Sequence, residues 1–436
     1  MRPHPRSGME EVLYAFPTPL MDTLHQTLHP SKHIAHYSGF FDKRLYSSFK
    51  GVLASLLLLR QGKQADMAAL CRKSPSALQH FFAKAHWCGD QLNAWRLRLL
   101  RSRKETHDRT TDILVLDGTP LAKDKDCESE GIGRVFDNRI KRTVRGYEAF
   151  GAAIVTASGI TYPLRLLLHL PSKRKTLWQA WSVFLHWCLR HTKAWLVVVD
   201  RGFRNAFFLA IILCAQREFL VRATITMPVW VPAERKPSRK KRGRKKRFPN
   251  REKKSVRQAL RGQPGIRCQG GMLKILPSIV VDAWKNQISR RCSVIVFHRD
   301  GFRYPLVLVH SRKDITLEEA MELLQCYFKR WKIEGCFLEL KQLFQLESFK
   351  VTSIIAIERS IALCLVAHSI LLALALGLPG LQVLRAFIAF ALRRLRGIKR
   401  LTLQSLKLFL ELSFSRLYDF TALFRQFLAK NPAFDV

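Results

Sequence analysis

The sequence predicts an α/β protein with a mixed sheet covered by helices on both faces and helical regions before and after it. Two observations predict this class. Between residues 111 and 222, short β-branched apolar runs alternate with helical patterns. In residues 45–105, and again after Pro379, apolar residues recur at helical spacing. With 436 residues, 48% of them hydrophobic, the chain has room for two or three domains.

The charge of the chain indicates a polyanionic partner. Lys and Arg number 74 and Asp and Glu number 33, which gives a formal net charge of +41. Self-repulsion of this size disfavours a compact state, and a polyanion relieves it. Nucleic acid is the first candidate, and an anionic membrane surface is the second.

The ten cysteines and the apolar segments favour a cytoplasmic protein. No two cysteines have the two-residue spacing of a zinc knuckle or redox motif, so we expect neither zinc nor disulfides. The N-terminus has no apolar stretch of secretory length. Residues 360–378 have about the minimum length of a membrane span. They contain His368 and Ser369, however, and we expect a buried core helix and no membrane partner.

The N-terminal region is predicted to be a helical DNA-binding domain. Two short helices are broken at Ser74-Pro75, where serine suits the N-cap and proline the first helical position. The pair fits either a helix-turn-helix that reads a DNA groove or an ordinary helical hairpin. The second helix offers Gln79, His80 and Lys84 as polar contacts.

The central region carries two acids at the ends of predicted strands. Residues 113–117 and 195–200 are apolar strands that end in Asp117 and Asp200. Because ligand sites in open α/β sheets lie at strand ends, we expect the two carboxylates to share one crevice. The other elements predicted here are two strands with a turn at Ser158-Gly159, helices at 176–191 and 205–218, and a strand at 219–225.

Residues 223–312 are predicted to be β-rich and to contain a polybasic loop. Thirteen of the twenty residues 235–254 are Lys or Arg, a composition typical of a flexible segment. The loop either contacts the phosphate backbone or is solvated without a specific role. The proposed DNA contacts in it are Lys240, Lys241, Arg242, Arg244, Lys245 and Lys246.

A capping box, Thr316 to Glu319, predicts the start of a long helix that extends through residues 327–341. At about 100° per residue, Tyr327, Arg330, Glu334 and Lys341 lie in one stripe about 60° wide and about 21 Å long. Such a stripe suits a row of phosphates with a metal-binding acid at its centre. One carboxylate holds Mg²⁺ poorly, so Glu334 is expected to join the two strand-end aspartates.

The pattern Tyr327-x2-Arg330-x3-Glu334-x6-Lys341 matches the Y-x2-R-x3-E-x6-K (YREK) signature of bacterial insertion-sequence transposases of the DDE class. The chain resembles the insertion sequence four-type family over residues 110–375, and "VLDGT" and "VVVDRGF" are similar to the segments that hold the family's two aspartates. The resemblance implies a ribonuclease-H-like fold. It also implies a mostly β insertion, because 134 positions separate the second aspartate from the glutamate.

The resemblance further implies an activity. Asp117, Asp200 and Glu334 would hold two Mg²⁺ ions, with Mn²⁺ as a substitute, for cutting element ends and joining 3′-hydroxyl ends to target DNA. Tyr327, Arg330 and Lys341 would grip the phosphates beside the scissile bond. The implied partners are double-stranded DNA, in the terminal repeats and the target, and a second copy of the chain in the DNA complex of a bacterial nucleoid.

Several alternatives stay open. Arg201 and Arg222 either touch DNA or form structural ion pairs. Trp230 and Trp284 either stack on an extruded base or pack in the core. A weaker alternative replaces Asp117 by one of three nearby acids, which are Asp124, Asp126 and Asp137. The rival functions are a nuclease of the same fold without strand transfer, a non-catalytic DNA-binding protein derived from a transposase, and a basic membrane protein.

The expected domains follow this reading. They are an N-terminal DNA-binding domain, two parts of a catalytic domain separated by the insertion, and a helical C-terminal region suited to dimerisation. The N-terminal domain is expected at 1–110 and the C-terminal region at 379–436. The catalytic domain is expected at 111–222 and 313–378, with the insertion at 223–312 between its two parts.

Overall fold

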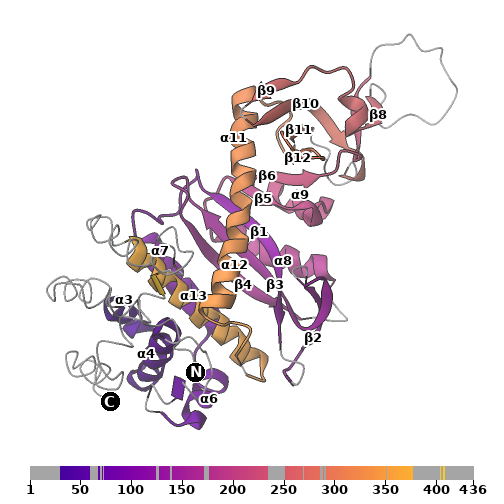
Figure 1. Ribbon diagram of the computed structural model, residues 1–436. Coiled ribbons are helices and arrows are strands. Elements are labelled where there is room, and N and C mark those ends of the chain that lie inside the picture. The colour runs from indigo at the N-terminus through magenta and orange to yellow at the C-terminus, as the bar shows by residue number, and fades with distance from the viewer. Residues whose placement is uncertain are drawn as a thin grey trace, which may run out of the picture. The chain divides into compact units, whose positions relative to one another are not determined.

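The computed structural model divides the chain into two compact units, described separately below (Figure 1). Unit 1 takes in the described residues of Met1–His107, Pro120–Ala149 and Gly335–Val436, and unit 2 those of Asp108–Thr119 and Phe150–Glu334. The described residues are 30–58, 67–68, 71, 73–123, 127–137, 140–170, 176–233, 251–268, 270–284, 288, 291–349, 351–376, 403 and 406–407.

The described strands form a mixed sheet, as the sequence predicts. Its order is β2-β3-β1-β5-β6-β12-β11-β10-β7-β8, with β4 beside β3 and β9 beside β10. β1, β5 and β6 are parallel, and β6, β12, β11 and β10 follow one another in antiparallel pairs. The bounds are β1 Ile113–Ala122, β2 Gly133–Asp137, β3 Arg142–Val155, β4 Thr161–His169, β5 Leu196–Val199, β6 Glu218–Ala223, β7 Pro228–Pro232, β8 Arg251–Ser255, β9 Ile266–Cys268, β10 Gly271–Val281, β11 Cys292–Arg299 and β12 Leu306–His310.

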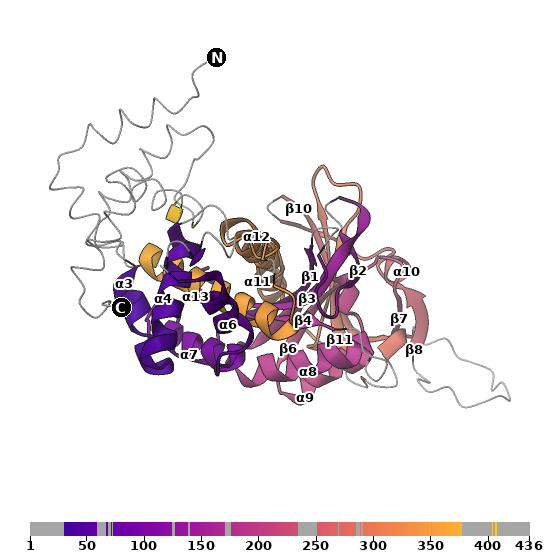
Figure 2. The same ribbon diagram turned by 90° about the horizontal axis from the view of Figure 1, so that it is seen from below.

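The helices of unit 2 lie on both sides of its central strands. Figure 2 shows α8 (Leu177–Arg190) and α9 (Ala206–Cys214) on one side and α11 (Leu317–Phe328) on the other. Side-chain caps begin all three: Thr176 and Thr316 form capping boxes, and Asn205 accepts from the Phe208 N–H. Between these helices the first four residues of β1 and all of β5 are apolar and buried, because a strand covered on both faces has no solvent side.

The segment between β6 and α11 is mostly β, as expected for the insertion. It contains β7 to β12, one short helix α10 (Val256–Ala259) and a 3₁₀ turn η3 (Asp282–Trp284). The expectation of a flexible loop throughout 235–254 is wrong at its end, because β8 begins at Arg251 and pairs with β7. Residues 234–250, which include all six proposed DNA contacts of the loop, lie outside the described residues.

Unit 1 is built around α13 (Ile354–Leu376), which packs on four helices. These are α3 (Ser31–Ala35), α4 (Lys43–Leu58), α6 (Pro75–Ala83) and α7 (Gly89–Arg101), with a 3₁₀ turn η1 (Ser38–Phe40) before α4. α6 begins as predicted, with the Ser74 side chain accepting from the Ala77 N–H. α13 is long and apolar enough to cross a membrane, but 89% of its most apolar window is buried, as expected of a core helix.

Three expectations about elements need correction or stay open. β1 does not end at Asp117 but continues for five residues. The long helix is not continuous: a 3₁₀ turn, η4 (Lys329–Trp331), separates α11 from α12 (Lys332–Leu343). The helices expected after Pro379 lie outside the described residues, except for residues 403 and 406–407. The bounds of the five expected segments stay predictions.

Candidate active site

Sheet register places the two aspartates side by side in unit 2. The parallel pairing of β1 with β5 ends with Leu116 opposite Val199. Asp117 is the next residue of β1, and Asp200 is the first residue after β5. Neighbouring strands lie about 4.8 Å apart, so the two acids leave the sheet at adjacent points. The shared position expected from the sequence therefore follows from the register, although β1 itself continues past its acid.

Arg330 joins the third acid to the first. Its Nη1 lies 3.0 Å from Asp117 Oδ2 and its Nη2 lies 2.9 Å from Glu334 Oε1, so that one guanidinium bridges two carboxylates. The residue is only 3% exposed. Charge-assisted contacts of this length are among the stronger hydrogen bonds in proteins. Arg330 and Glu334 are four residues apart across the start of α12, and this helical spacing brings their side chains together.

Asp200 is held by two other groups. The Tyr327 hydroxyl donates to Asp200 Oδ1 at 3.3 Å, and Arg222 Nη1 lies 3.8 Å from the same oxygen. Arg222 therefore forms an ion pair, which is one of the two roles expected for it, and its side chain is still 47% exposed. Asp117, Asp200, Tyr327, Arg330 and Glu334 thus form one connected set in unit 2, called the acidic cluster below.

Burial and mutual repulsion perturb the acidic cluster. Burial raises the pKa of Asp117 to about 6, and the charges of Glu334 and Asp200 act in the same direction. Arg330 and the Gly118 N–H oppose this rise. The charge of the cluster is therefore incompletely balanced.

The two partner side chains keep their protons. Burial raises the pKa of Tyr327 to about 12, with Asp200 adding to the rise, so the phenol is a neutral donor at pH 7. Burial alone would lower the pKa of Arg330, but Asp117, Tyr327, Asp200 and Glu334 more than offset this and raise it.

The donor set of the acidic cluster fits a hard divalent cation. Its three carboxylates offer only oxygen, the ligand that Mg²⁺ prefers. Two of them already bind a guanidinium, which shows that the position attracts positive charge. The Nε of Arg330 is buried and has no hydrogen-bond partner, so this side chain is not fully satisfied where it lies. Asp117, Asp200 and Glu334 are therefore the candidate ligands for such a cation in this cluster.

The fourth residue of the predicted stripe has its partners in unit 1. Lys341 Nζ donates to the Pro120 carbonyl oxygen and lies 3.2 Å from Glu347 Oε1. That Lys341 lies in line with Tyr327, Arg330 and Glu334 stays a prediction, although η4 shows that the helix is not continuous from Tyr327 onward. Glu347 was missed because nothing in the local sequence marks it as the partner of a lysine.

The other candidates fall into three groups. Arg201 is exposed in the 3₁₀ turn η2 (Arg201–Phe203), directly after Asp200. Both tryptophans of the insertion have protein partners: Trp230 Nε1 donates to Asp282, and Trp284, 2% exposed, donates to the Arg204 carbonyl oxygen, which favours core packing. The polar residues on the second N-terminal helix, Gln79, His80 and Lys84, are exposed.

The structure gives no support to the three acids considered as replacements for Asp117. Asp137 is buried in β2 of unit 1 and paired by register with Arg142, whereas Asp117 belongs to unit 2. Asp124 and Asp126 lie outside the described residues. Sequence reasoning also missed Trp331, which is 57% exposed with the Arg330 guanidinium 5.1 Å from its ring centre. An aromatic residue next to the arginine of a polar stripe was the available signal.

Comparison with known proteins identifies the family. A family model described as the transposase DDE domain matches residues 108–370, which is more than half of the chain and includes Asp117, Asp200 and Glu334. The comparison with curated proteins gives no significant match. The family model accounts for the large mixed sheet with its flanking helices and implies DNA as the partner. The chain belongs to the DDE-domain transposases.

Proposed function

We propose that the chain is the transposase of a bacterial insertion sequence of the four-type family, with the YREK signature formed by Tyr327, Arg330, Glu334 and Lys341. It would cut the ends of its element and join the 3′-hydroxyl ends to target DNA in a homodimeric complex in the cytoplasm. The acidic cluster carries the proposal: Arg330 links Asp117 to Glu334, and the Tyr327 hydroxyl donates to Asp200 beside them.

Asp117, Asp200 and Glu334 would hold two Mg²⁺ ions. When bound, such ions lower the pKa of the attacking water or hydroxyl and neutralise charge on the leaving oxygen. The protein's part is to fix the three carboxylates and to exclude alternative geometries. Tyr327, with a pKa of about 12, would donate its proton in a hydrogen bond to a phosphate oxygen without ionising.

Arg330 has a second role in this proposal. In the structure its guanidinium balances Asp117 and Glu334. Once cations neutralise these carboxylates, its planar donors would be released to a phosphate of the strand being cut. Lys341 would contact the same strand, which requires it to leave Glu347. The residues that balance the acids before DNA arrives are thus the ones that would hold it afterwards.

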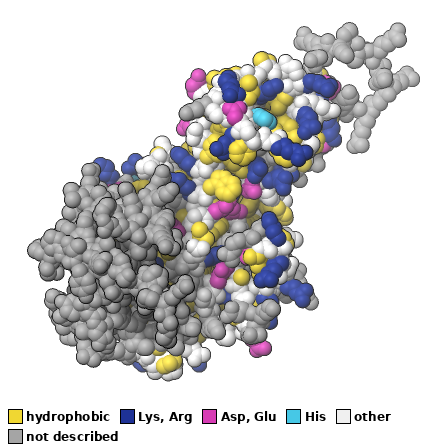
Figure 3. Space-filling view, in the orientation of Figure 1, with side chains coloured by type: hydrophobic (Ala, Val, Ile, Leu, Met, Phe, Trp, Pro, Cys, Tyr) yellow, Lys and Arg dark blue, Asp and Glu magenta, His cyan; other side chains and the backbone are white. Residues whose placement is uncertain are grey.

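The surface charge supports a DNA partner. Figure 3 shows Lys and Arg side chains over the segment that contains β9, β10 and β11. In this part of the chain Arg267 has 67% of its side chain exposed, and Arg299 and Arg303, the latter just after β11, are also exposed. With Arg201, Arg222 and the polybasic segment that contains Lys240 to Lys246, they would contact the phosphate backbone. Binding that depends on such contacts weakens steeply with salt.

The proposal is tested with DNA that carries the element's own ends. In Mg²⁺ the wild-type protein should cut at the element boundary and join a pre-cleaved 3′-hydroxyl end to a plasmid. Glu334→Gln should bind the DNA but lose both reactions, because an amide is a poor ligand for Mg²⁺. Glu318→Gln, on the exposed first turn of α11, is the matched control and should keep them.

The outcomes separate the rival functions. Cutting without joining would identify a nuclease of the same fold. Binding without cutting by the wild type in Mg²⁺ or Mn²⁺ would identify a non-catalytic DNA-binding protein. Retention of cleavage by Glu334→Gln would remove the assigned role of the acidic cluster.

A further inference from the structure

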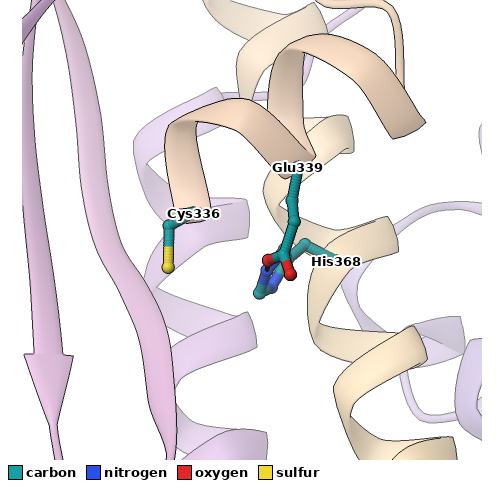
Figure 4. A group of neighbouring side chains, drawn as sticks. All are labelled: Cys336, Glu339 and His368. Atoms are coloured by element: carbon teal, nitrogen blue, oxygen red, sulfur yellow. Dashed lines mark hydrogen bonds and ion pairs between the residues drawn. The ribbon is translucent and has the colours of Figure 1, made fainter. Parts of the chain in front are cut away.

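A second set of possible metal ligands lies in unit 1, apart from the three acids of unit 2. Cys336 and Glu339 are three positions apart on α12 and therefore share one face of that helix, and His368 lies on α13 (Figure 4). One ligand atom from each of the three lies within 4.8 Å of the others. Figure 4 shows the Glu339 carboxylate directed at the His368 ring.

The burial of this set leaves one polar atom without a partner. His368 is 0% exposed and Cys336 is 4% exposed, whereas the Glu339 side chain is 29% exposed. His368 Nε2 lies 2.9 Å from Glu339 Oε2. Its Nδ1 is buried and has no hydrogen-bond partner. Buried polar atoms are rarely left unpaired, and the described hydrogen bonds account for Nε2 of this imidazole but not for its Nδ1.

The donor types indicate which cation would fit. A thiolate, an imidazole and a carboxylate together suit zinc-type transition ions, whereas Mg²⁺ prefers oxygen alone. With metal–ligand bonds of about 2.0 to 2.3 Å, tetrahedral ligands lie roughly 3.3 to 3.7 Å apart. The present spread of up to 4.8 Å exceeds this by about 1 Å. Rotation of the Cys336 and Glu339 side chains covers such a difference.

We propose that Cys336, Glu339 and His368 bind one Zn²⁺-type ion that joins α12 to α13 in unit 1. Three protein ligands leave a fourth position, which water can reach past the partly exposed Glu339 carboxylate. The ion would hold α12 to α13 and so fix the helix whose first turn carries Glu334, two residues before Cys336. The inference does not depend on the proposed transposase reaction.

The proposal is tested on the full-length, untagged protein after removal of metal with a chelator. With excess Mg²⁺ present to saturate the acidic cluster, Co²⁺ is added in steps. A thiolate-to-cobalt charge-transfer absorption should appear and saturate at one equivalent, and Zn²⁺ should abolish it. Cys336→Ser should lack the band. Cys326→Ser, which replaces a buried cysteine of α11, is the matched control and should keep it.

Metal-dependent stability gives an independent readout. Zn²⁺ should raise the thermal unfolding midpoint of the wild type and of Cys326→Ser, but not of Cys336→Ser or His368→Gln. If either of these fails to fold, Glu339→Gln serves instead, because it retains a hydrogen bond to His368 while removing the anionic ligand. Absence of a one-equivalent band in the wild type, or its survival in Cys336→Ser, overturns the proposal and leaves a metal-free His368–Glu339 ion pair.

Discussion

Replacement of Asp117 by Asn should stabilise the metal-free protein. Burial raises the pKa of this carboxyl from 3.8 to about 6, with Glu334 and Asp200 adding to the rise. Between pH 3.8 and about 6, the folded state therefore holds a proton that the unfolded chain has already lost. Asparagine has nearly the same shape as a protonated aspartate and cannot ionise, so it removes the cost of the buried charge.

The size and sign of the effect follow from linkage. Below pH 3.8 the carboxyl is protonated in both states, and the two proteins should differ little. As the pH rises from 3.8 to about 6, the unfolded chain binds fewer protons than the folded one, so the stability of the wild type falls. Above about pH 6 the difference is constant at about 3 kcal/mol in favour of Asp117→Asn.

The assay is thermal and urea unfolding in EDTA at several pH values between 4 and 8. Asp314→Asn is the control, because its side chain is 57% exposed and its removal should change little. Addition of Mg²⁺ should stabilise the wild type and leave Asp117→Asn unchanged. An Asp117→Asn protein that is less stable than the wild type at pH 8, with a difference that does not shrink in acid, would contradict this reasoning.

Two further predictions concern buried arginines. Arg330→Met should lower the free energy of unfolding by about 3–5 kcal/mol in EDTA, because two carboxylates lose their counter-ion. It should also tighten Mn²⁺ binding measured by electron paramagnetic resonance, and weaker binding would show that the guanidinium supports the metal. Arg359→Met should cost about 3 kcal/mol, because this 7% exposed side chain donates to three backbone carbonyls, that of Phe82 in the last turn of α6 and those of Ala85 and Trp87 after it. Arg98→Met, which replaces an exposed side chain of α7, is its control, and an unchanged midpoint for Arg359→Met would refute the stabilising role of these hydrogen bonds.

Local patterns predicted the elements well wherever the signal was contained in one segment. Ser74-Pro75 begins α6 and Thr316 begins α11, because a cap depends on neighbouring backbone N–H groups. The acid after β5 was placed correctly for a similar reason. The prediction was wrong for the end of β1, since strand pairing, which no short window contains, extends that strand through Ala122.

In the candidate site, too, local spacing predicted some contacts and missed others. Tyr327, Arg330 and Glu334 were correctly grouped by helical spacing, which survives the short turn η4. Lys341 was grouped by the same rule, yet its contacts are with Pro120 and Glu347, which the pattern did not contain. Helical spacing predicts which side chains share a face, but it does not predict the tertiary partners that a long lysine side chain reaches.

The sequence by itself determined the α/β class, the basic charge that calls for a polyanionic partner, and the identities of the acids, because these depend on composition and on neighbours along the chain. Only the tertiary structure decided that one arginine bridges two of those acids. It likewise decided that Cys336 and Glu339 meet His368, nearly thirty residues away on another helix. Such contacts depend on strand register and helix packing, which bring together side chains that no local pattern relates.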